Sequence, residues 1–220
     1  MTVISLLSDF GLKDSYVAEM KAVILSICPE ARIVDISHQI EKFNIRMGAY
    51  VLASAAAYFP KKTIHVVVVD PGVGTKRRHI LTVTKHAFYV GPDNGLLMLS
   101  AQRQDIGHVY HITNKQCMLP EVSRTFHGRD IFAPTAAHLA KGLIPSEVGS
   151  EIHDHIVPEF TKPSLSENTA LGEVLHIDSF GNVVTNVSVR ELEKIGLREG
   201  SVLNVKLKED VVKLKLSTAY

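Results

Sequence analysis

Hydrophobic and polar residues alternate along the chain in a pattern that predicts strands and helices in turn. Short apolar runs rich in valine and isoleucine are typical of buried strands, and they occur at residues 3–8, 32–37, 63–69, 80–84 and 87–91. Residues 14–29 and 45–60 carry apolar side chains at helical spacing and end at prolines, and a further helix is expected at 131–143. Because strands alternating with helices form parallel sheets, the pattern predicts an α/β fold with a mostly parallel sheet flanked by helices.

The pattern changes near residue 158. Residues 158–169 contain two prolines and several small polar residues, which is typical of a connecting segment. Beyond them, apolar and polar residues alternate in GEVLHIDSFGNVVTNVS, SVLNVKLK and VVKLKLS, and this predicts antiparallel strands. We therefore expect an N-terminal α/β domain over residues 1–160, a linker at 161–169, and a smaller, β-barrel-like C-terminal domain over 170–220.

The overall composition narrows the class of protein. Lys and Arg number 24 against 23 Asp and Glu, and a net charge of +1 argues against nucleic-acid or membrane-surface partners. No apolar run approaches the roughly 20 residues of a membrane span, and the N-terminus lacks the basic region of a secretory signal. Cys28 and Cys117 lie far apart without metal-ligand spacing, so we expect reduced thiols in a cytoplasmic protein.

Candidate chemistry is expected at the carboxyl ends of the strands, where open parallel sheets bind their ligands. Asp9 directly follows the first strand, where a carboxylate can accept hydrogen bonds from a ribose diol. Asp14 starts the next helix, and ligand binding and helix capping are equally good interpretations there. Asp70 follows four valines at the edge of a buried strand, where a carboxylate needs a partner. Arg77 and Arg78 can supply it, either in a structural ion pair or in a site.

Three later segments carry further candidates. His127 lies in TFHGRDIFAP, and histidine is the usual proton acceptor near neutral pH, although one of 11 histidines can equally be structural. Asn94 lies in GPDNGLL, which is a turn by composition. Asp178 and Asn182 lie in DSFGNVVTN, which by itself predicts a hairpin turn.

Taken together, these segments resemble the S-adenosyl-L-methionine (SAM) hydroxide adenosyltransferase family, whose relatives include SAM-dependent fluorinases and chlorinases. The matching segments follow one another in the family's order and span nearly the whole chain: SDFGLKD, VVVVDPGVGTKRR, GPDNGLL, TFHGRDIFAP and DSFGNVVTN. The resemblance implies an enzyme that hydrolyses SAM to adenosine and L-methionine, with water or hydroxide attacking the ribose C5′. It implies no metal and no other cofactor.

The resemblance also implies roles for individual residues. The family's catalytic residues fall on Asp70, Arg77 and His127. Its substrate contacts fall on Asp9, Asp14, Asn94, Asp178 and Asn182, with Asp9 at the ribose hydroxyls and the last two at the methionine end. The implied assembly is a homotrimer in which SAM lies between the N-terminal domain of one subunit and the C-terminal domain of its neighbour.

The chemistry of SAM fits these residue types. The leaving group departs as a neutral thioether, so activation of the nucleophile is the main requirement and no general acid is needed. His127 is the expected acceptor of the water proton, and Asp70 is expected to orient either the imidazole or the arginine. Arg77, which stays protonated, is expected to stabilise hydroxide character electrostatically.

A halogenase is the first alternative, because a halide ion can make the same displacement. By the family pattern, halogenases replace this loop with one rich in hydroxyl residues around the halide. The chain retains Asp70 and Arg77 instead, which favours hydroxide.

Two further alternatives stay open. Family members usually continue beyond residue 220 through a segment that contacts the adenine, so the C-terminal domain is expected to be incomplete. The chain is then also a candidate SAM- or adenosine-binding module with little turnover. A metal-assisted hydrolase of another small molecule is less favoured, because the sequence has no HExxH motif.

Overall fold

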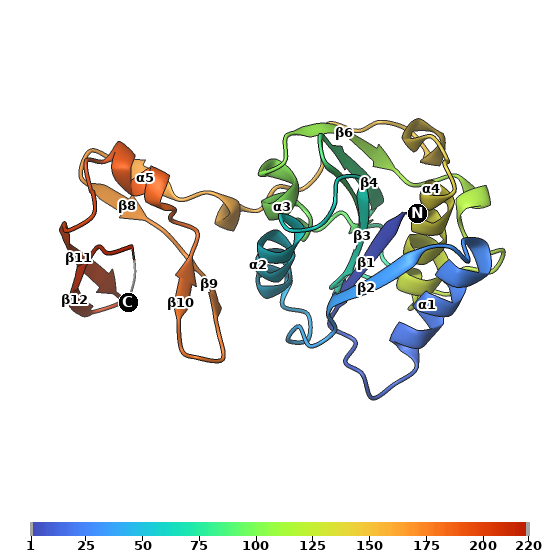
Figure 1. The fold of residues 1–220 in the computed structure, drawn as a ribbon, viewed down its shortest axis with the longest axis horizontal. Coiled ribbons are helices and arrows are strands. Elements are labelled where there is room, and N and C mark those ends of the chain that lie inside the picture. The colour runs from blue at the N-terminus through green and yellow to red at the C-terminus, as the bar shows by residue number, and fades with distance from the viewer. Residues whose placement is uncertain (1, 219–220) are drawn as a thin grey trace. The chain divides into compact units, whose positions relative to one another are not determined.

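The computed structural model describes residues 2–218, in which each strand and helix predicted for the N-terminal domain is present (Figure 1). Six strands form one sheet in the order β2-β1-β3-β5-β4-β6. Their bounds are Val3–Ser8 (β1), Arg32–Ser37 (β2), Thr63–Val68 (β3), His79–Thr84 (β4), Ala87–Pro92 (β5) and Ile106–His111 (β6). The edge strand β6 has no counterpart among the predicted strands, since its apolar residues are interrupted by histidines and most of it is only partly buried or exposed.

Four α-helices accompany the sheet: α1 (Tyr16–Ile27), α2 (Ile45–Ala56), α3 (Met98–Gln102) and α4 (Ala133–Ala140). The helix predicted at 131–143 begins earlier, as a π-helical turn over Gly128–Phe132, and continues as α4. Short 3₁₀ turns lie at Lys115–Cys117 and Pro145–Val148. π-turns inside helices occur frequently at functional sites, and this one directly follows His127.

Five of the six strands run in the same direction. The pairs β1–β2, β1–β3 and β3–β5 are parallel, whereas β4 is antiparallel to both β5 and β6. Only residues 85 and 86 separate β4 from β5, and a connection this short permits a hairpin but no parallel crossover. The sheet is therefore mostly parallel, as expected, with one reversed strand.

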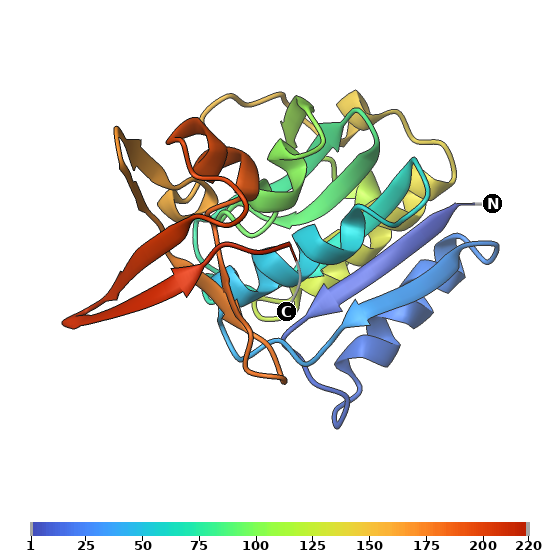
Figure 2. The same cartoon turned by 60° about the vertical axis from the view of Figure 1, so that its left-hand side comes forward.

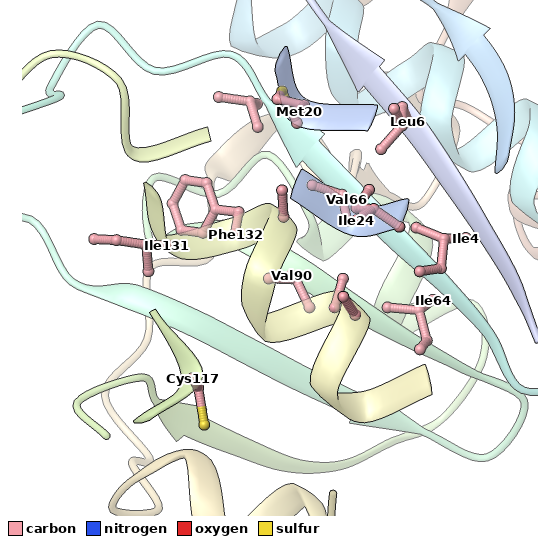
Figure 3. Packing of buried hydrophobic residues seen from close by; sticks show 14 of the residues in the cluster. Ile4, Leu6, Met20, Ile24, Ile64, Val66, Val90, Cys117, Ile131 and Phe132 are labelled. Carbon is pink, nitrogen blue, oxygen red and sulfur yellow. The ribbon is translucent and has the colours of Figure 1, made fainter. Parts of the chain in front are cut away.

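Helices cover both faces of the sheet, α1 and α4 on one and α2 and α3 on the other (Figure 1). Every residue of the central strand β3 is buried, and the four valines, residues 66–69, pack on both faces of the sheet. Val66 and Val68 belong to the cluster beneath α1 and α4, whereas Val67 and Val69 belong to the cluster on the other side. Figure 3 shows the first cluster, in which Val66 lies close to side chains from α1 and from the segment leading into α4. Burial of each of these valines stabilises the fold by on the order of 1.5–3 kcal/mol. The end of the strand is therefore fixed in position by its packing.

The chain divides into two compact units after Pro158. In its described residues, 159–218, the second unit contains three antiparallel strand pairs and one α-helix. The β11–β12 hairpin is drawn in red in Figure 2. The pairs are β7 (Ser164–Ser166) with β8 (Thr169–Leu171), β9 (Val174–Ile177) with β10 (Val183–Thr185), and β11 (Val202–Leu207) with β12 (Asp210–Lys215); the helix is α5 (Val189–Lys194). A 3₁₀ turn, Glu159–Thr161, opens this unit. The segment expected as a linker, 161–169, contains β7 and the first residue of β8.

Candidate active site

An Asp–Arg–His chain lies at the carboxyl end of β3. The Arg77 guanidinium grips Asp70 with two groups: Nε donates to Oδ1 at 3.0 Å and Nη2 donates to Oδ2. The same Nη2 lies 2.8 Å from His127 Nδ1. Asp70 and Arg77 are both largely buried, and charge-assisted, two-point pairs of this kind fix geometry as well as charge. The structure thus brings these three side chains together, and Asp70 contacts the arginine.

A glycine lets the two loops that carry these residues meet. Gly74 has a φ of +77°, and a Cβ atom there would lie 2.5 Å from the Arg124 carbonyl oxygen. Left-handed backbone conformations and such close approaches are both available to glycine at little cost. The loop after β3 can therefore pack directly on the loop before the π-turn, which places Arg77 beside His127.

A second histidine adjoins His127. His79 opens β4, and its Nε2 lies 3.0 Å from His127 Nδ1. Burial and the Arg77 charge lower the pKa of His127, with the carboxylates of Asp70 and Asp130 opposing the shift. Burial, followed by Arg77, lowers the pKa of His79 to about 3. Both imidazoles are therefore neutral near pH 7.

A cavity of about 170 Å³ opens beside this cluster. Its lining joins the end of β1, the loop before α2, the end of β3 and the loop before the π-turn: Asp9, Phe10, Lys42, Phe43, Val68, Asp70, Val73, Thr125, Phe126, His127 and Gly128. Apolar walls with a few convergent charged groups are typical of small-molecule sites. We therefore place the candidate active site here.

A larger cavity, of about 390 Å³, lies where β5 begins and α2 and α3 end. Its basic lining residues are Lys61, His86 and Arg103. Cationic side chains at helix C-termini complement the helix dipole. Neither carboxylates nor a hydrogen-bonded catalytic cluster line this cavity, so its greater size does not make it the better candidate.

Asp9 stabilises an unusual turn at the mouth of the site. It is 5% exposed, and its Oδ2 accepts a hydrogen bond from the Phe43 backbone N–H at 2.9 Å. Lys42 Nζ donates to the Asp9 carbonyl oxygen at 2.5 Å. Phe43 has a φ of +63° and is 64% exposed although it lines the cavity. Non-glycine residues seldom adopt this backbone conformation, so Asp9 offsets its cost.

An aromatic cluster forms part of the wall of the cavity, through Phe10 and Phe126. The rings of Phe10, Tyr16 and Phe126 contact one another with centroids 5.1–5.7 Å apart. Arg129 covers the Phe126 ring with its Cζ 4.9 Å from the centroid. Arg129 also binds the buried Asp130 and Glu19 of α1. Arg129 and Asp130 of the FHGRD segment thus hold the wall in place.

Similar known proteins show the family of this chain. Residues 4–149 match the family described as SAM hydroxide adenosyltransferase N-terminal domain. The chain is 36% identical over 231 residues to a Methanocaldococcus jannaschii protein named (R)-S-adenosyl-L-methionine hydrolase, covering 100% of this chain and 81% of that protein.

The chain belongs to the SAM hydroxide adenosyltransferase family.

Two further comparisons give a relative with another printed name and a similar solved structure. A protein from an Actinoplanes species named fluorinase is 30% identical over 222 residues, covering 89% of this chain and 74% of that protein. A solved structure of an uncharacterized conserved protein from Thermotoga maritima superposes with a TM-score of 0.88 at 40% identity, covering 98% of this chain and 83% of that one.

Of the substrate contacts that the family resemblance implies within the first unit, only Asp9 lines the cavity. Asp14 is exposed, and Ser15 occupies the N-cap position of α1. Asn94 stabilises its own turn: its Nδ2 donates to the Val69 carbonyl oxygen at 2.9 Å, and its Oδ1 accepts from the Leu96 N–H at 3.1 Å.

The remaining two predicted contacts belong to the second unit, where they bind each other. Asn182 Nδ2 donates to Asp178 Oδ2 at 2.7 Å, and the backbone N–H groups of Phe180 and Asn182 donate to Asp178 Oδ1. The two side chains therefore form the hairpin turn between β9 and β10. Phe180, at the tip of this turn, is 90% exposed.

Sequence reasoning missed His79, Phe43 and the distinct contacts of Arg78. His79 is the residue after the two arginines, but its contact depends on the direction of β4, which sequence patterns did not predict. In the sequence, the only indication that Phe43 belongs to a site is that it is an apolar residue within a polar loop. Arg78 binds Asp93 and Asp154 and so has a structural role.

Within the described residues 2–218, no cluster of three or more His, Cys, Asp or Glu side chains is arranged to hold a metal ion. The same part of the chain has no helix that is both long and apolar enough to cross a membrane.

Proposed function

We propose that this chain hydrolyses SAM to adenosine and L-methionine by attack of water on the ribose C5′. The observation that carries the proposal is the Asp70–Arg77–His127 chain beside a cavity, in a member of this family whose relatives include proteins named (R)-S-adenosyl-L-methionine hydrolase.

The proposed chemistry needs a positioned and activated water. The sulfonium leaves as a neutral thioether, so its departure needs no proton. Arg77 supplies a fixed positive charge next to the cavity, where it stabilises hydroxide character. Asp70 and His127 both line the cavity, and the Asp70 carboxylate can accept a hydrogen bond from the water. Holding the water in line with the C5′–S bond supplies much of the remaining acceleration.

The proposed substrate contacts follow the family resemblance. Asp9 holds the ribose hydroxyls, because its carboxylate lines the same cavity as Asp70 and His127. Asp14 and Asn94 are proposed to lie near the ligand, and Asp178 and Asn182 are proposed to bind the methionine end. The last four depend on the resemblance alone.

We further propose a homotrimer with the site at the subunit interface. A cavity of about 170 Å³ is smaller than the roughly 300–1,000 Å³ typical of pockets for drug-sized ligands. The first unit therefore encloses only part of a molecule as large as SAM. Exposed Phe43 at the cavity and exposed Phe180 in the second unit are apolar surfaces that a neighbouring subunit would cover. Light scattering should then give three times the 24.2 kDa chain mass.

A cytoplasmic location is part of the proposal. Cys28 and Cys117 are both buried free thiols, and reduced thiols are the usual state in the cytosol.

Incubation of the purified chain with SAM, followed by chromatography of the products, tests the function. We expect adenosine and L-methionine in equal amounts, and none above background from the Asp70→Ala variant. SAM binding by calorimetry without any adenosine would contradict the proposal and favour a binding module. 5′-Chloro-5′-deoxyadenosine in the presence of chloride would favour the halogenase alternative, which the fluorinase relatives make worth testing.

A further inference from the structure

Two nitrogen groups converge on one ring nitrogen in the candidate active site. Arg77 Nη2 lies 2.8 Å and His79 Nε2 lies 3.0 Å from His127 Nδ1. The guanidinium has five N–H donors and no acceptor. His127 Nδ1 must therefore present its lone pair to Arg77.

This requirement fixes the protons of both histidines. A neutral imidazole carries one proton, so an acceptor at His127 Nδ1 leaves that proton on His127 Nε2. His79 Nε2 faces the same lone pair and makes a favourable contact only when it carries a proton itself. The consistent arrangement is two donors, one charged and one neutral, on a single acceptor.

The surroundings favour this arrangement over its alternatives. The charged and titratable groups that act on His79 are Arg77, His127 and His111, and each disfavours a charged His79. His127 is also acted on by Asp70 and Asp130, whose charges oppose that of Arg77. The ring of Phe132 contacts the His79 ring, with centroids 5.7 Å apart, and its centroid lies 5.5 Å from Arg77 Cζ. The buried Phe132 ring therefore shields this side of His79 and Arg77 from water.

We infer that His79 is a positioning residue which, together with Arg77, holds His127 as the neutral tautomer protonated at Nε2. The tautomer is inferred from the contacts alone, whereas its consequence for catalysis rests on the proposed function.

The consequence is a division of roles between Asp70 and His127. With its Nδ1 lone pair engaged, His127 enters the reaction as a hydrogen-bond donor. Each Asp70 oxygen has two lone pairs, so the carboxylate can still accept the water proton while Arg77 holds it. As the C5′–O bond forms and the C5′–S bond breaks, the electron pair leaves with sulfur and the proton passes to Asp70 and then to solvent.

The tautomer is measured directly by NMR of the full-length protein labelled with ¹⁵N-histidine, without SAM, near pH 7.5. We expect His127, assigned by the loss of its signals in His127→Gln, to show the neutral form protonated at Nε2. A proton on Nδ1, or a charged imidazole, would overturn the inference. Because this readout needs no turnover, it stands apart from the test of the proposed function.

Substitution of His79 tests its own contribution. His79→Gln keeps an N–H donor near the position of Nε2, whereas His79→Leu removes it. Loss of one hydrogen bond corresponds to about a 2- to 13-fold effect, so we expect kcat to fall by that factor in His79→Leu with KM unchanged, and to recover largely in His79→Gln. The tautomer signals of His127 should broaden or divide only in His79→Leu.

The matched control is His108→Leu, which removes an exposed histidine from the neighbouring strand β6. It should leave both kcat and the His127 signals unchanged. Wild-type kinetics together with wild-type His127 signals in His79→Leu would overturn the role of His79. If His79→Leu does not fold, the tautomer of His127 in the wild type and the kinetics of His79→Gln test the role of His79. A fall of kcat in His79→Gln as large as the fall in His127→Gln would contradict that role.

Discussion

Adjacent arginines in this chain have different partners. Arg77 binds Asp70 and His127 at the cavity. Arg78 Nε donates to the buried Asp93 at 2.9 Å, and its Nη1 donates to Asp154 at 2.6 Å. Arg77 therefore belongs to the candidate site, whereas Arg78 binds the segment that ends the first unit to the turn after β5.

Lysine substitutions separate these two roles. Lysine keeps the charge but loses the planar two-point contact. We expect Arg77→Lys to lower kcat by about 10²–10³-fold, the usual loss for one electrostatic donor, with little change in melting temperature. Arg78→Lys should cost about 1–3 kcal/mol of unfolding free energy and leave kcat nearly unchanged. Kinetics and urea unfolding of both variants provide the check, and equal kcat losses in the two would contradict the division.

Buried His65 should make the stability sensitive to acid. Burial lowers its pKa to about 4, while an unfolded chain has about 6.5. Since the unfolded state then binds more protons, stability is fully present above pH 6.5 and falls as the pH drops towards 4, by about 3 kcal/mol for this residue. Urea unfolding between pH 7 and 4 measures the loss. His65→Phe should unfold more easily at pH 7 but with a shallower pH dependence, and an unchanged slope would contradict the assignment.

At the scale of elements, the loop after β3 depends on Gly74. Gly74→Ala combines an unfavourable φ with a collision against the Arg124 carbonyl oxygen. We expect a loss of about 1–3 kcal/mol and a fall in kcat, because Arg77 would shift away from His127. Gly142→Ala is the matched control, since Gly142 has a φ of +102° but open space around it. It should lose stability without losing activity, and normal kcat in Gly74→Ala would show that the loop contact is not needed.

Sequence patterns predicted the elements better than their connections. The valine run predicted the central strand because both faces of β3 are buried, and Asp70 was expected at its end. The direction of β4 was not predicted, because an apolar pattern has the same appearance in a parallel and an antiparallel strand. The contact of His79 with His127 depends on that direction. Motif order indicated Asp70, Arg77 and His127, whereas only the folded loops show which of them touch.

On the scale of the whole molecule, the two units differ in how much core they have. The first contains two buried hydrophobic clusters, one on each face of its sheet. In the described part of the second unit, residues 159–218, Leu175 is the only buried hydrophobic residue. Small domains with little buried apolar surface are marginally stable at best.

Separate fragments should therefore behave differently. We expect residues 1–158 to unfold cooperatively on heating, and residues 159–220 to show no cooperative transition when expressed alone. Circular dichroism during a thermal scan distinguishes the two outcomes. A sharp transition in the 159–220 fragment would contradict this view and would show that the second unit is an independent domain.

The most direct measurement of the central claim follows the oxygen atom. The full-length chain is incubated with SAM in H₂¹⁸O, and the masses of the products are determined by mass spectrometry. Attack of water on C5′ predicts one ¹⁸O in adenosine and none in L-methionine. Unlabelled adenosine, or label in the methionine, would contradict the mechanism.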